Sequence, residues 1–167
     1  MLRKYLVGIA LALLLAAPAH SDELPAPVGD ILLTVDGAIT NTNAGNALQL
    51  DRSMLASLPQ IVVRTTTDWT DGIGEFVGPS VRDVLALAGA EGSVVRAVAL
   101  NDYAVDIPME DFERFDVVLA MTMDGEQLSA RDKGPIWIVY PRDDNPELDA
   151  PEVNARWIWQ LVALTVR

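Results

Sequence analysis

The chain has 167 residues, no cysteine, a single histidine (His20) and a formal net charge of −12 at pH 7. Without cysteine there is no thiolate nucleophile, disulfide bond or thiolate ligand for a metal, and one histidine cannot supply a cluster of imidazole ligands. The acidic balance argues against nucleic acid or an anionic membrane as partner, because both attract positive charge. A basic partner and a simple solvated surface both fit this charge.

The first 21 residues are typical of an export signal. Arg3 and Lys4 precede an apolar stretch over residues 5–16 that is too short to span a bilayer. We expect cleavage after Ala19 or Ser21 and a periplasmic location, with a membrane anchor as the alternative. Because the twin-arginine pair is missing, the chain is expected to cross the membrane unfolded and to acquire any ligand afterwards.

The rest of the chain predicts a flexible leader over residues 22–29, which contains two prolines, and one domain over residues 30–167. The expected elements are, in chain order, a strand over 31–35, a helix between Asp51 and Pro59, a strand over 61–66, a loop over 65–78, a helix from Pro79 to Gly89, strands over 94–100 and 104–107, a helical or turn segment over 108–115, a hairpin made of 117–123 and 126–128, a strand over 136–140, an acidic loop over 142–154 and a strand over 157–166. Many strands with two or three short helices predict an α+β fold with a mixed sheet system.

The first candidate binding segment is the loop around Trp69. A tryptophan among threonines and glycines has little local structure to pack on, so it can offer a flat stacking face. Thr67 and Asp68 stand beside it as hydrogen-bonding groups. The alternative is that Trp69 only fills the core under the loop.

Asn101, Asp102 and Tyr103 form a second polar segment between two predicted strands. Asparagine and aspartate are common turn residues, so a turn alone explains the first two. If the segment binds a ligand, its amide, carboxylate and hydroxyl groups would act together.

Arg131 and Lys133 concentrate positive charge in an acidic chain, next to Gly134. Glycine lets a ligand approach the backbone, so an anion or a carbonyl oxygen is a reasonable target. Ion pairs with neighbouring carboxylates are the alternative. Trp157 and Trp159, two residues apart in a predicted strand, are interpreted as core residues rather than ligand contacts.

The order of these segments resembles the molybdopterin-binding fold of the sulfite oxidase family, over about residues 30–166. Residues 77–85 resemble its G-x-x-L-x-x-L-L helix, and residues 124–141 resemble its N-G-x-x-L-x-x-x-H-G-x-P stretch. The resemblance implies a pterin-shaped cleft in which Trp69 stacks on the pteridine ring and Asp68 or Asp102 accepts hydrogen bonds from its amino edge. Tyr103, Arg131 and Lys133 would contact carbonyl or side-chain oxygen atoms of the ligand. The predicted pterin-binding residues are Thr67, Asp68, Trp69, Asn101, Asp102, Tyr103, Arg131, Lys133 and Gly134.

The chain departs from that family where the metal would be held. A cysteine shortly before the loop tryptophan coordinates molybdenum in the family enzymes, and the corresponding place here is about Thr65. Lys133 stands where the family has histidine before glycine. A neutral hydroxyl does not replace a thiolate on a high-valent metal, so we predict neither a metal ligand nor a catalytic residue.

In this respect the chain resembles a group of small exported relatives that bind free pterins and report to a membrane sensor, such as one that makes or degrades cyclic-di-GMP. The resemblance implies a periplasmic, non-catalytic pterin-binding protein whose partner is the periplasmic domain of a sensor. A free pterin is expected in preference to molybdopterin. The alternatives are a molybdenum-cofactor-dependent oxidoreductase, or a subunit of one, and an interaction module that has lost its ligand.

Overall fold

The structure is a computed structural model that describes residues 24–167. The predicted signal peptide and the first two residues of the predicted leader lie outside the described residues. Within residues 24–167, no helix is long and apolar enough to cross a membrane.

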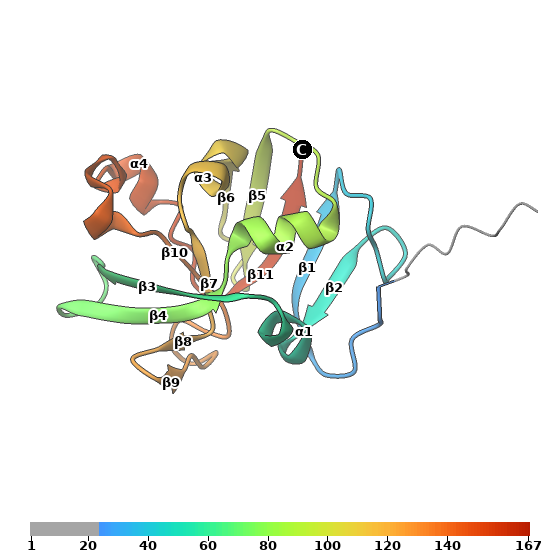
Figure 1. Ribbon diagram of the computed structural model, residues 1–167, viewed down its shortest axis with the longest axis horizontal. Coiled ribbons are helices and arrows are strands. Elements are labelled where there is room, and N and C mark those ends of the chain that lie inside the picture. Colours follow the sequence, from blue (N-terminus) through green and yellow to red (C-terminus); the bar gives the residue numbers. More distant parts are fainter. Residues whose placement is uncertain (1–23) are drawn as a thin grey trace, which may run out of the picture.

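A five-stranded sheet forms one half of the molecule (Figure 1). Its strands run in the order β2-β1-β11-β5-β6, and only the pairing of β1 with β11 is parallel. Side chains alternate between buried and partly exposed along β5, the period-two pattern that places one face of a strand against the core. The strands of this sheet are β1 (Ile31–Gly37), β2 (Leu48–Asp51), β5 (Val94–Ala99), β6 (Ala104–Pro108) and β11 (Leu161–Val166).

Two smaller sheets form the other half. The longer one is a hairpin of β3 and β4 extended by two short strands, and the hairpin projects away from the five-stranded sheet (Figure 1). The other is an antiparallel pair of fully buried strands, β7 and β10. The strands are β3 (Gln60–Thr66), β4 (Ile73–Pro79), β7 (Val118–Ala120), β8 (Thr122–Met123), β9 (Glu126–Gln127) and β10 (Trp137–Val139).

Short helices connect and cover the sheets, and their ends are explained by local chemistry. The Asp51 side chain accepts a hydrogen bond from the Met54 amide and caps α1, and Ser80 caps α2 in the same way. Gly89, with φ 60°, ends α2 in the left-handed conformation that glycine adopts without strain. The helices are α1 (Arg52–Ser57), α2 (Val81–Ala88), α3 (Met109–Arg114) and α4 (Pro151–Asn154).

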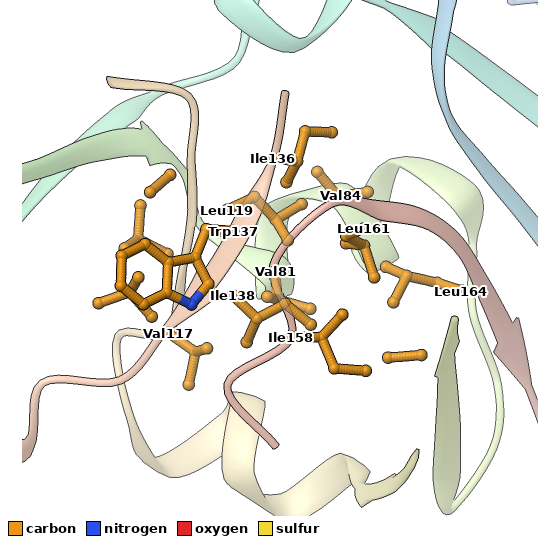
Figure 2. Packing of buried hydrophobic residues seen from close by; sticks show 14 of the residues in the cluster. Val81, Val84, Val117, Leu119, Ile136, Trp137, Ile138, Ile158, Leu161 and Leu164 are labelled. Carbon is orange, nitrogen blue, oxygen red and sulfur yellow. The ribbon is translucent and has the colours of Figure 1, made fainter. Parts of the chain in front are cut away.

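The halves share one hydrophobic core. Val81 and Val84 of α2 pack with Leu161 and Leu164 of β11, and the buried pair of β7 and β10 lies next to them (Figure 2). The predicted α+β class with mixed sheets is confirmed. Residues 24–29 of the predicted leader contact this domain, because the Val28 and Gly29 amides donate to the Asp51 carboxylate at 2.9 Å each.

Several predicted elements differ from the structure. The predicted loop over 65–78 contains β4, whose glycines weakened the strand pattern; a Cβ at Gly78 would collide with the Leu119 carbonyl. Because β4 extends to Pro79, α2 begins only after the Ser80 cap. The predicted strand over 117–123 divides at Met121 into β7 and β8, which pair with different partners.

The C-terminal third differs as well. The predicted acidic loop over 142–154 contains two 3-10 turns, Arg142–Asp144 and Pro146–Leu148, and α4. The predicted strand over 157–166 begins only at Leu161, since Gln160 has φ 53° and breaks the extended backbone. The prediction for Trp157 and Trp159 was therefore wrong about their strand conformation. The other predicted strands and helices are confirmed within a few residues.

Candidate ligand-binding cavity

A cavity of about 400 Å³ lies where the end of β5, the loop before β4 and the segment before β11 meet. Its volume falls within the range of small-molecule sites, about 300–1,000 Å³. Aromatic and small apolar side chains dominate its wall. The lining residues are Trp69, Ala99, Asn101, Tyr103, Asn154, Ala155, Trp157, Ile158 and Trp159.

All four tryptophans of the chain gather at this wall or directly behind it. The Trp69 ring centroid lies 5.4 Å from that of Trp159 and 5.9 Å from that of Trp157. Behind them, the fully buried Trp137 lies 6.2 Å from Trp69. Trp69 thus packs against the core and also lines the cavity, so its two interpretations are compatible. The interpretation of Trp157 and Trp159 as core residues is confirmed, because Trp157 is buried in the core and Trp159 packs against it; both also line the cavity.

Asp68 supports the cavity wall. Its Oδ1 accepts a hydrogen bond of 2.8 Å from Arg142, and its Oδ2 accepts one of 2.7 Å from the Asn154 amide. The Arg142 side chain is only 12% exposed and also donates to the Thr66 hydroxyl at 3.2 Å. Thr67 holds the same loop, since its hydroxyl accepts from the Trp69 amide at 3.0 Å.

Thr65, the residue nearest to the place expected for the metal ligand, is completely buried in β3. Its hydroxyl accepts a hydrogen bond of 3.2 Å from the Asp143 amide. The Asp143 carboxylate in turn accepts from the hydroxyl and the amide of Thr66 at 2.6 and 2.8 Å. These hydrogen bonds, above all that from the Thr66 side chain, hold the pKa of Asp143 below its usual range.

This donor set does not fit molybdenum. The chain has no cysteine to supply the thiolate, and the hydroxyl at Thr65 is engaged within the protein. Among residues 24–167, no three histidine, cysteine, aspartate or glutamate side chains are grouped so as to hold a metal ion.

The 101–103 turn contributes two of the three residues predicted from it. Asn101 and Tyr103 line the cavity; the Asn101 side chain accepts from the Tyr103 amide, and the Tyr103 hydroxyl donates to the Ala155 carbonyl, each at 3.1 Å. Asp102 has φ 65° and is exposed at the tip of the turn, outside the lining residues of the described chain.

The 131–134 segment lies apart from the cavity lining found in residues 24–167. Arg131 is exposed, and Lys133 pairs with Asp132 at 3.1 Å, which is the ion pair weighed as an alternative. A Cβ at Gly134 would collide with the Leu128 backbone, so this glycine permits close packing of the chain on itself. The segment is nevertheless joined to the wall, since the Gln160 side chain donates to the Ala130 and Asp132 carbonyls at 2.8 and 3.1 Å.

A buried polar group fixes the aromatic wall from behind. The Asp111 carboxylate of α3 accepts 2.9 Å and 2.6 Å hydrogen bonds from the Tyr140 hydroxyl and from Arg156, the residue before Trp157. Burial, and then the neighbouring Asp111 carboxylate, raise the pKa of the Tyr140 hydroxyl well above its usual value. The phenol therefore stays protonated and donates to Asp111.

Sequence reasoning missed the contribution of the segment from Asn154 to Trp159. Asn154 stands in an acidic stretch and carries no pattern that distinguishes it. The one usable signal was the pair of tryptophans, because two large aromatic residues close to a chain turn are typical of a binding wall as well as of a core.

Comparison with known proteins identifies a family for this chain. No curated protein matches the chain. A family model described as the oxidoreductase molybdopterin binding domain matches residues 35–143, more than half of the chain. The cofactor in that description is a pterin, and the match includes the Trp69 loop, the Asn101–Tyr103 turn and Thr65. The chain therefore belongs to the family of oxidoreductase molybdopterin-binding domains of the sulfite oxidase type.

Proposed function

We propose that this chain is an exported, non-catalytic protein that binds a free pterin in the tryptophan-lined cavity. One observation supports the proposal: a molybdopterin-binding domain with an aromatic cavity has a buried, hydrogen-bonded threonine, Thr65, near the place expected for the metal ligand. Flat aromatic walls suit a flat heterocycle, because offset or edge-on contacts between rings are favourable.

In this proposal the pteridine ring stacks on Trp69, and Asn101 and Tyr103 border it on the side of the five-stranded sheet. Thr67 and Asp68 hold the loop and the opposite wall in place through their hydrogen bonds to Trp69 and Asn154. The molybdenum cofactor supplies redox chemistry when a thiolate holds its metal. Since the donor set does not fit it, no redox step is assigned to this chain.

We further propose that the protein works in the periplasm and reports ligand occupancy to the periplasmic domain of a membrane sensor, as in the exported relatives that it resembles. The segment over 142–154 is the proposed contact surface. It joins the cavity through Arg142 and Asn154, and it exposes a group of acidic side chains to which a basic surface is complementary. These side chains are Asp144, Glu147, Asp149 and Glu152.

The test is to purify the protein from the periplasm of the organism that makes it, denature it and analyse the released small molecules by mass and fluorescence, with molybdenum measured on the same sample. About one free pterin per chain without molybdenum is the expected result. Molybdenum with a pyranopterin would overturn the proposal and establish the oxidoreductase. If neither is found, and the empty protein binds no pterin on titration, the interaction module is the better interpretation.

A further inference from the structure

Two buried polar atoms of the cavity wall have no hydrogen-bond partner among residues 24–167: the indole Nε1 of Trp157 and the side-chain Oδ1 of Asn154. Both residues line the cavity, and Trp157 is only 3% exposed. Buried polar groups in native proteins are nearly always hydrogen-bonded, so two such exceptions in one cavity point to a ligand that supplies the missing partners.

The hydrogen-bond character of both atoms is known. The Asn154 Nδ2 donates to Asp68 Oδ2 at 2.7 Å, and Arg142 holds the same carboxylate at 2.8 Å. Because a carboxylate only accepts, turning the amide over would set oxygen against oxygen, and Oδ1 must be the free atom. Asn154 therefore presents an acceptor, whereas the indole of Trp157 can only donate.

The other lining residues add no charge to the wall. They are aromatic or apolar, apart from Asn101 and Tyr103, whose side chains already bond within the chain. The neighbouring guanidinium of Arg142 is paired with Asp68. A phosphate group that entered this cavity would lose its water without meeting a free positive charge, which is unfavourable.

We propose that the cavity selects a neutral, unphosphorylated planar heterocycle that donates an N–H to Asn154 Oδ1 and accepts a hydrogen bond from Trp157 Nε1. This inference rests on the proposed function and names the ligand class and the residues that discriminate it. Phosphate-bearing pterins, molybdopterin among them, are selected against. Both atoms expose almost no surface, so the ligand reaches them through a small shift of the neighbouring wall, in which Trp69 lies 5.9 Å from Trp157.

The experiment is calorimetric titration of the mature chain and three variants with 6-hydroxymethylpterin and its phosphate monoester, and with guanine and xanthine as planar heterocycles of another class. Trp157→Phe keeps a ring but removes the donor, and Asn154→Leu removes the acceptor. Trp137→Phe is the matched control, because it removes an equally buried, unpaired indole N–H that lies behind the cavity.

We expect the first two variants to bind 6-hydroxymethylpterin about tenfold more weakly, since each leaves a polar atom of the bound ligand unpaired. The control should bind like the unchanged protein, and the phosphate ester should bind the unchanged protein at least about tenfold more weakly than the alcohol. Equal affinity of Trp157→Phe and Trp137→Phe, or of ester and alcohol, would overturn the inference. If Trp157→Phe does not fold, Asn154→Leu and the pair of ligands still decide.

The proposed function can fail separately. If the unchanged protein ignores the pterins but binds guanine or xanthine, with the same loss in Trp157→Phe, the pterin proposal fails and the inference holds. If the unchanged protein binds pterin and both variants bind it with the same affinity, the pterin proposal holds and the inference fails. Binding of none of these probes overturns both.

Discussion

Two neighbouring regions of the molecule, one around Thr65 and Asp143 and one around Asn154 and Trp157, differ in whether their polar groups have hydrogen-bond partners. On the side of Thr65, the hydroxyls of Thr65 and Thr66 and the Asp143 carboxylate form a closed network. On the side of Asn154 and Trp157, two buried polar atoms have no partner in the described chain. The comparison shows that the polar groups around Thr65 are satisfied within the protein, whereas two buried polar atoms beside the aromatic cavity are not.

The largest expected effect comes from removing what holds the aromatic wall. Asp111→Ala leaves Arg156 and Tyr140 without their buried acceptor, and breaking a buried charge pair costs about 3 kcal/mol of unfolding free energy. Urea unfolding followed by tryptophan fluorescence measures this loss. Asp111→Asn, which keeps one acceptor, is the control and should lose less; an unchanged stability for Asp111→Ala would show that this support is dispensable.

The next effect concerns the ligand. Trp69→Ala removes the proposed stacking face, which we expect to weaken pterin binding about 30-fold, or about 2 kcal/mol. Trp69→Phe should retain most of the affinity, because it preserves a flat ring. Titration calorimetry gives both constants, and equal affinity of the alanine variant and the unchanged protein would place the ligand elsewhere.

Thr65→Val tests the hydrogen-bond network around Thr65 and Asp143 with almost no change of side-chain volume. The Asp143 amide loses its acceptor, so we expect the unfolding free energy to fall by about 1 kcal/mol. Thr65→Ser keeps the acceptor and should lose less through the hydrogen bond, but it also removes a buried methyl group. Pterin affinity should be the same in all three proteins. A loss of binding in Thr65→Val would mean that the network around Thr65 also contributes to ligand binding.

The pH dependence of stability should reflect the hydrogen-bonded carboxylate of Asp143. Because the pKa of Asp143 is lowered on folding, its contribution is present above the ordinary carboxyl pKa, about 3.9, and is lost as pH falls below that value. Asp143→Asn should therefore lose less stability than the unchanged protein between about pH 5 and about pH 3. Parallel curves for the two proteins in thermal unfolding would contradict this assignment.

The smallest expected effect concerns a residue that the sequence predicts to contact the pterin but that does not line the cavity. Arg131 is a predicted pterin contact, yet it is exposed and lies outside the lining found in residues 24–167. If the cavity is the whole site, Arg131→Ala changes pterin affinity by less than about twofold, within the usual effect of a surface substitution. A larger loss would restore the 131–134 segment to the site.

Much of the fold was predictable because the information was local. The Asp51 and Ser80 caps, the glycine that ends α2 and the alternation in β5 all lie within a few residues of the structure that they determine. β4 was missed because glycines removed the side-chain pattern, and their reason is distant: Gly78 makes room for the Leu119 carbonyl. Of the residues that line the cavity, Trp69 was predictable because it lies in a conspicuous loop, whereas nothing near Asn154 distinguishes that residue from its neighbours.

By itself, the sequence determined the chemical inventory: no thiolate for a metal, four tryptophans and an acidic surface. It also determined the α+β class, through the periodicity of its apolar residues. Only the tertiary structure decided which groups are free to bind. Hydrogen-bond partners such as Asp68 with Asn154 and Thr65 with Asp143 are separated by more than 70 residues, and whether a polar atom is satisfied depends on which distant segment folding places beside it.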